Sequence, residues 1–148
     1  MDTEKLLTSL NENKIDFIVI GATAFPVYGY ARATLDIDLF VRPEKENIRR
    51  LRKALMDFGY DLCDISAEDM LENKLLIRQY ALETDIHPFV KGVTFNDIWK
   101  KKIMAKFGNT EVYFPCLDDM IRMKKAAGRA KDLEDLKYLT KIKAKKKY

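Results

Sequence analysis

The chain has 148 residues, a length that predicts one domain covering residues 1–148. With 47% hydrophobic and 34% charged residues it can form both a core and a polar surface, which argues against disorder. The formal net charge of +4 is mild, so it permits a polyanionic ligand without requiring one.

The sequence gives no sign of a membrane or an export segment. No apolar run approaches the roughly 20 residues that span a bilayer, and the start lacks the basic-then-apolar layout of a signal peptide. We therefore expect a cytoplasmic protein without membrane contacts. Cys63 and Cys116 have no C-x-x-C partner. In a reducing compartment we expect free thiols, packed as small apolar groups, rather than a disulfide or a metal site.

The first forty residues alternate helical and extended patterns. Leucines at helical spacing predict a helix over 3–12. The β-branched run at 15–20, bounded by turn residues, is typical of a buried strand. A turn then leads into a short helix over 23–28. Strict alternation over 34–41 predicts a strand that is aliphatic on one face and carries Thr, Asp, Asp and Phe on the other.

The middle of the chain continues in the same way. Apolar residues recur over 44–58 as in a helix that covers a sheet. A third strand is expected at 60–65 and a short helix from Ser66 to about residue 72, because an acid stands three residues after the serine. Two further strands are expected at 74–80 and 82–90.

The last third is mainly helical. Thr94 is expected to cap a helix that runs through residue 99, a final strand covers 111–114, and two helices follow at 117–127 and 130–142. Lysines crowd the end of the chain. We favour a solvated, fraying terminus for them, and a nucleic-acid contact is the alternative. The fold class is therefore α/β (α+β), a mixed sheet flanked by helices with C-terminal helices packed on it.

Two aspartates share one face of the strand predicted at 34–41. Asp36 and Asp38 project together because the other face is wholly aliphatic. Oxygen ligands suit Mg²⁺, and a pair of ions held by such carboxylates stabilises the attacking and leaving oxygens of phosphoryl transfer. Asp85, in the alternating stretch T-D-I-H, supplies a third acid. The alternative is that the aspartates only solvate an exposed face.

Two other residues offer chemistry near these acids. Gly21 directly follows a buried strand and precedes a helix. Backbone N–H groups at such a helix start can hold phosphate, with help from the Thr23 hydroxyl. The alternative is that Gly21 only forms a turn. His87, the only histidine, shares strand parity with Asp85. It could act as a base at the rim of the site, but we favour a partly exposed residue without a chemical role.

These motifs resemble the minimal nucleotidyltransferases of the DNA polymerase β superfamily. That family has an apolar strand ending in Gly and then Gly or Ser, followed after a short helix by Asp-x-Asp; here the segments are I-V-I-Gly21-Ala22 and Arg32-Ala-Thr-Leu-Asp36-Ile-Asp38. The segment 21–38 is especially similar to the abortive-infection (AbiEii-like) type, found as toxins in toxin–antitoxin pairs. The stretch 117–136 resembles the same subgroup's C-terminal helical motif.

The resemblance implies a role for each matching residue. Asp36, Asp38 and Asp85 would ligate Mg²⁺ (or Mn²⁺). The alternative role for Asp85 is to take the proton from the attacking hydroxyl. Lys124 would reach the nucleotide phosphates or the acceptor. The residues implied in nucleotide binding are Gly21, Ala22, Thr23, Arg32, Arg129 and Asp132. Ala22 departs from the usual Gly or Ser, so one phosphate contact is missing.

The predicted function is transfer of a nucleoside monophosphate from an NTP to a hydroxyl acceptor with release of pyrophosphate. The acceptor is open: a protein side chain, a tRNA end or a small molecule, bound in part on a second subunit of a homo-oligomer. The alternative is a catalytically silent nucleotide-binding or interaction module of a toxin–antitoxin pair. A basic RNA-binding domain is a third, weaker hypothesis.

Overall fold

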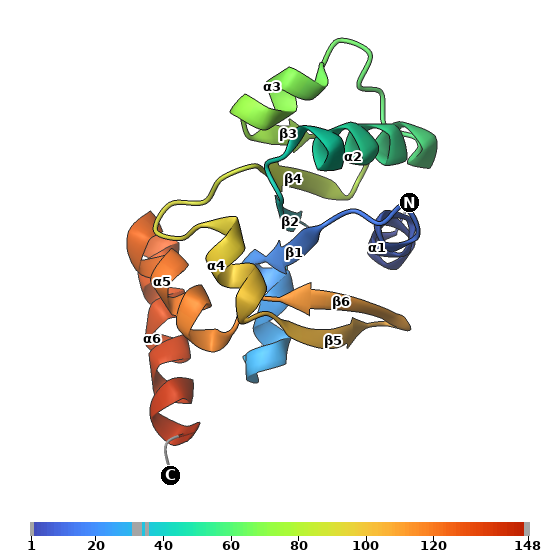
Figure 1. Ribbon diagram of the computed structural model, residues 1–148. Helices are drawn as coiled ribbons and strands as arrows, with labels where there is room; N and C mark the ends of the chain where they lie inside the picture. The colour runs from blue at the N-terminus through green and yellow to red at the C-terminus, as the bar shows by residue number, and fades with distance from the viewer. Residues whose placement is uncertain (1, 31–33, 35, 147–148) are drawn as a thin grey trace.

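The computed structural model describes residues 2–30, 34 and 36–146. It is a mixed α+β structure in which helices flank a four-stranded mixed sheet and two helices form the C-terminal end (Figure 1). The predicted fold class is thus confirmed. Among the helices in this part of the chain, none is both long and apolar enough to cross a membrane.

Most elements lie where the sequence predicts them, and the four strands of the main sheet are shorter than predicted. The helices are α1 (Thr3–Glu12), the 3₁₀ helix η1 (Gly21–Tyr28), α2 (Lys45–Phe58), α3 (Ala67–Glu72), α4 (Phe95–Lys100), α5 (Leu117–Ala127) and α6 (Ala130–Lys146). The strands are β1 (Phe17–Ile20), β2 (Asp36–Val41), β3 (Leu75–Ile77), β4 (Glu83–His87), β5 (Ile103–Phe107) and β6 (Thr110–Phe114).

The main sheet has the strand order β1-β2-β4-β3. Its two central strands, β2 and β4, are parallel, while the outer strands β1 and β3 pair antiparallel to them. β5 and β6 form a separate antiparallel hairpin, and β6 lies close to β1. The parallel central pair therefore brings two segments that are far apart in the sequence into direct register.

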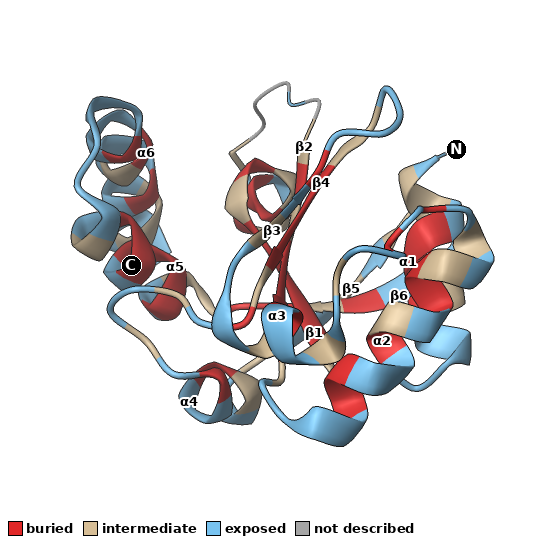
Figure 2. Cartoon of the chain, turned by 90° about the horizontal axis from the view of Figure 1, so that it is seen from above, coloured by how far each residue is buried: buried red, intermediate tan, exposed pale blue. Residues whose placement is uncertain are grey.

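Helices cover both sides of the main sheet. α1 and α2 lie on one side and α5 and α6 on the other (Figures 1 and 2). The apolar stripes of α1 and α2 and the strands β1 and β2 supply fully buried side chains to the core. Removing such groups from water is the main source of stability. These buried side chains include Leu6, Leu7, Leu10, Ile18, Ile37, Leu39, Ile48, Leu51 and Leu55.

The strand predicted at 60–65 is wrong. Tyr60 and Leu62 are buried, as alternation suggests, but the segment has no strand partner. Instead Arg52 of α2 donates Nε to the carbonyl of Ile65 at 2.7 Å and Nη2 to that of Leu62 at 2.9 Å. A long side chain thus satisfies carbonyls that a sheet would otherwise pair.

The hairpin strand β5 was not predicted, because its side chains are mostly exposed and mixed in polarity. The signal that identifies it is Gly108-Asn109, a two-residue turn between alternating stretches. Gly108 has φ +60°, a value that glycine adopts without a steric cost.

The remaining local predictions have mixed outcomes. The caps at Ser66 and Thr94 are confirmed, since their side chains accept from the backbone N–H three residues on. The terminal lysines Lys141, Lys145 and Lys146 are exposed, as a solvated end requires, but the chain stays helical as far as residue 146, and Lys143 pairs with an α5 carboxylate at 2.7 Å. Both cysteines are free as predicted, but Cys63 is exposed rather than packed, and Cys116 is half-buried.

Candidate active site

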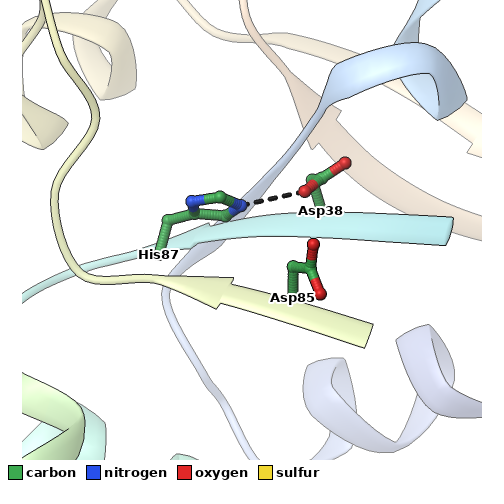
Figure 3. A group of neighbouring side chains, drawn as sticks. All are labelled: Asp38, Asp85 and His87. Carbon is green, nitrogen blue, oxygen red and sulfur yellow. Dashed lines mark hydrogen bonds and ion pairs between the residues drawn. The ribbon is translucent and has the colours of Figure 1, made fainter. Parts of the chain in front are cut away.

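The register of the parallel strands brings two predicted acids together. Asp38 of β2 stands opposite Asp85 of β4, and both side chains leave the sheet on the face opposite the buried Leu39 and Ile86. His87 follows on the same face of β4, and Figure 3 shows the three side chains projecting to one side of the two strands. One potential ligand atom from each lies within 4.8 Å of the others.

His87 contacts one of these acids directly. Its Nε2 lies 2.9 Å from Asp38 Oδ1, and the two side chains are 15% and 26% exposed (Figure 3). The sequence favoured a partly exposed histidine without a chemical role. The side chain is indeed half-buried, but its contact favours the alternative that it belongs to the site. Strand parity with Asp85 is the sequence signal for this placement.

Asp36 shares the face of Asp38 but stands apart from the Asp38–Asp85–His87 group. It lies opposite Glu83 in the parallel register. The hydrogen bond with Asp36 raises the pKa of Glu83, with a further contribution from the charge on Asp85. The sequence analysis did not single out Glu83, although it alternates with Asp85 and His87 along β4.

Asp85 also has a cationic partner that the sequence analysis missed. Arg78, just after β3, donates Nη1 to Asp85 Oδ1 at 2.7 Å. This hydrogen bond raises the pKa of Arg78. The guanidinium therefore fixes the orientation of the Asp85 side chain.

A cavity of about 620 Å³ opens over this face of the sheet, bounded by η1 and by α5 and α6. It is large enough for a small-molecule ligand. The predicted site residues that line it are Gly21, Ala22, Asp36, Asp38, Asp85, Lys124, Arg129 and Asp132. Residues of the lining that the sequence analysis did not assign include Lys74, Phe89, Lys91, Met120, Met123 and Lys131.

Gly21 is required by its backbone and by its neighbour. It begins η1 with φ +73°, where L residues are strained, and a Cβ there would lie 2.6 Å from Asp38 Oδ2. Ile20, the preceding residue, pairs with Asp38 across the antiparallel β1–β2 ladder. The missing side chain thus leaves room for the carboxylate beside the helix start.

One predicted nucleotide-binding residue stands elsewhere. Thr23 is not part of the cavity lining; its hydroxyl donates to the backbone carbonyl of Asp36 at 3.2 Å, which ties η1 to the start of β2. Arg32 lies outside the described residues.

The buried Tyr28 anchors the far end of η1, because its hydroxyl donates to the Pro115 carbonyl at 2.5 Å, just before α5. Burial raises the pKa of Tyr28.

The opposite wall holds a buried ionic cluster. Lys124 Nζ of α5 lies 3.1 Å from Asp132 Oδ1 and 3.3 Å from Asp135 Oδ2 of α6. Arg129, in the turn between the helices, pairs through Nε with Asp132 Oδ2 at 2.6 Å. Burial raises the pKa of Asp132, but the hydrogen bonds from Arg129 and Lys124 outweigh it, so the pKa is lowered.

Arg129 also faces the acids of the sheet. Its hydrogen bond to Asp132 and, to a smaller extent, the charge on Asp38 raise its pKa. Its side chain remains 62% exposed, so the guanidinium is accessible to a ligand in the cavity. Asp135, which was not predicted as a site residue, is as buried as Asp132.

The site thus combines aligned carboxylates on a mixed sheet with cations on the C-terminal helical segment. The model of the family described as "Nucleotidyltransferase of unknown function (DUF6036)" matches residues 1–143. The chain belongs to this nucleotidyltransferase family. No curated protein matches the chain significantly.

Gly21→Ala should destabilise the fold more than Gly29→Ala. Both glycines have positive φ, so both substitutions strain the backbone by about 1 kcal/mol. Only at position 21 does the new Cβ meet a carboxylate; at Gly29 it meets nothing within 4 Å. We expect Gly21→Ala to cost about 1–3 kcal/mol more in urea unfolding. Equal losses would contradict the close approach to Asp38.

Asp132→Asn should destabilise the protein more at neutral pH than in acid. Breaking a buried ion pair costs on the order of 3 kcal/mol. Because the folded-state pKa of Asp132 is lowered, its contribution is complete above the unfolded pKa of about 4 and is lost as the pH falls through the folded value. Urea unfolding at pH 7 and pH 3 should show the difference shrinking. A loss that is equal at both pH values would exclude the charge as its cause.

Proposed function

We propose that this protein transfers a nucleoside monophosphate from an NTP to a hydroxyl acceptor and releases pyrophosphate. The observation that carries the proposal is the register of Asp38 with Asp85 on parallel strands, facing a cavity whose opposite wall holds Lys124 and Arg129. Acids on one wall, and on the other the accessible cations Arg129 and Lys131 beside the ion-paired Lys124, suit a metal–triphosphate ligand. The family to which the chain belongs supports the same class of reaction.

The residues present fit a divalent ion. Carboxylate oxygens are the ligands that Mg²⁺ and Mn²⁺ take, and the donors of Asp38 and Asp85 lie within 4.8 Å of each other beside the space that Gly21 leaves open. Asp36, Asp38 and Asp85 would hold the ion or ions. When bound, a divalent ion neutralises phosphate charge and stabilises the oxygens of the displacement.

The protein's own groups would bind and orient the triphosphate. Backbone N–H groups at Gly21 and Ala22, at the start of η1, would face phosphate oxygens. Arg129 would supply a guanidinium that can grip phosphate with two parallel hydrogen bonds. Lys124, whose Nζ lies between Asp132 and Asp135, would be held too firmly to follow a ligand, so its charge acts at a fixed point.

The transfer itself joins the acceptor oxygen to the α-phosphorus while the bond from that phosphorus to the bridging oxygen breaks, and pyrophosphate leaves. Asp85 would receive the proton of the attacking hydroxyl, or ligate the ion while water takes the proton. Its pairing with Arg78 supports a carboxylate held ready in one orientation.

We further propose that the chain is one domain, related to the abortive-infection (AbiEii-like) nucleotidyltransferases and so to toxin–antitoxin pairs. The geometry of the Lys124, Arg129 and Asp132 motif supports this, because all three meet in one ion-paired cluster. The acceptor is a protein side chain, a tRNA end or a small molecule, and a cognate toxin or antitoxin or a second subunit completes its site.

The double variant Asp36→Asn/Asp38→Asn should abolish transfer with little loss of stability. Loss of metal ligands removes the charge stabilisation on which the reaction depends. The assay follows pyrophosphate release and transfer of α-³²P label with each NTP, with the protein itself, bulk tRNA and an aminoglycoside as acceptors. Asp57→Asn, at an acid 65% exposed on α2, is the matched control and should behave as wild type.

Full activity in the double variant would contradict the proposed mechanism. Metal-dependent NTP binding without pyrophosphate release in the presence of any of these acceptors would instead favour the silent module. Ala22, which stands where the related enzymes have Gly or Ser, is the specific feature that favours this second function.

A further inference from the structure

His87 gives this site a nitrogen donor among its oxygens. It is the only histidine of the chain, and one of its ring nitrogens belongs to the group of three ligand atoms within 4.8 Å that Asp38 and Asp85 complete; Nε2 is the nitrogen that contacts Asp38 (Figure 3). Only 15% of the side chain is exposed, and His87 pairs across the strands with the buried Phe40. The ring is therefore held over the carboxylates and does not extend into solvent.

The spacing of the donors matches two neighbouring positions around one ion. His87 Nε2 and Asp38 Oδ1 are 2.9 Å apart. Adjacent ligands of an octahedral ion with bonds of about 2.1–2.2 Å are separated by about 3 Å. An ion could thus replace the hydrogen bond between these two atoms with little movement of either side chain. The Nε2 lone pair would face the ion, and the proton of the neutral ring would reside on Nδ1.

The chemistry of the donor set then favours some ions over others. Mg²⁺ prefers oxygen ligands and retains much of its water. Imidazole suits divalent transition-metal ions, and Mn²⁺ accepts it together with carboxylates. A site with two carboxylates and one imidazole therefore discriminates against Mg²⁺ more than a site of three carboxylates does.

We propose that His87 Nε2 coordinates the divalent ion together with Asp38 and Asp85, and that this nitrogen makes the site prefer Mn²⁺ to Mg²⁺. The inference rests on the proposed function, because it concerns the ion that the transfer requires. It assigns a role that the residues of the Asp-x-Asp motif do not supply.

The direct test is the electron spin echo spectrum of bound Mn²⁺, which detects nitrogen nuclei coordinated to the ion. The protein is purified without a histidine tag and loaded with Mn²⁺, once at natural abundance and once with ¹⁵N-labelled histidine. Because the chain has one histidine, any signal that changes from ¹⁴N to ¹⁵N comes from His87. We expect that change in wild type, and no bound Mn²⁺ at this site in Asp38→Asn.

His87→Gln separates coordination from a purely supporting hydrogen bond. Glutamine can still donate an N–H to Asp38, but it offers only an oxygen to the ion. Calorimetric titrations with Mn²⁺ and with Mg²⁺ should show the ratio of the two affinities falling about tenfold in the variant.

The outcomes distinguish this inference from the proposed function. Mn²⁺ bound in an Asp38-dependent way, without coupling to histidine nitrogen or with an unchanged affinity ratio in His87→Gln, would overturn the role of His87 alone. Failure of wild type to bind either ion, with or without NTP, would overturn the metal site and the proposed function with it.

Discussion

The parallel pairing of β2 with β4 is the constraint on which the site depends. One register sets Asp38 against Asp85 and Asp36 against Glu83, and a shift of either strand by one residue would turn the acids of that strand into the core. The aliphatic face prevents that shift, because Ile37 and Leu39 are fully buried. The hydrophobic core thus determines where the charged groups lie. It holds carboxylates close together although their like charges repel.

The C-terminal helices complete the site through buried polar contacts. Lys124, Asp132 and Asp135 join α5 to α6, and the Tyr28 hydroxyl ties η1 to the segment that leads into α5. Removing one member of such a cluster leaves a buried charge without compensation, which makes the arrangement sensitive to single substitutions. The cations are therefore fixed in position across the cavity from the acids.

Much of this arrangement could be predicted from the sequence, because periodicity reports which face of an element is buried. The alternation around Asp36, Asp38 and Asp85 was enough to assign those acids to one face. Contacts that depend on how the elements pack against one another could not be predicted. The ion pair of Arg78 with Asp85 depends on how β3 pairs with β4. The segment predicted as a strand at 60–65 is irregular, and Arg52 binds its backbone carbonyls. The contact of His87 with Asp38 could not be predicted for the same reason, since the two residues are far apart in the sequence.

The central claim is that Asp38 and its neighbours bind a metal–triphosphate complex. Thermal unfolding with each of the four NTPs, with and without Mg²⁺ or Mn²⁺, tests it most directly in wild type and in Asp38→Asn. A ligand that binds only the folded protein raises the midpoint by mass action. The account predicts a rise that needs both the metal and an NTP and that is lost in the variant. No rise with any nucleotide in the wild type, or the same rise in Asp38→Asn, would contradict it.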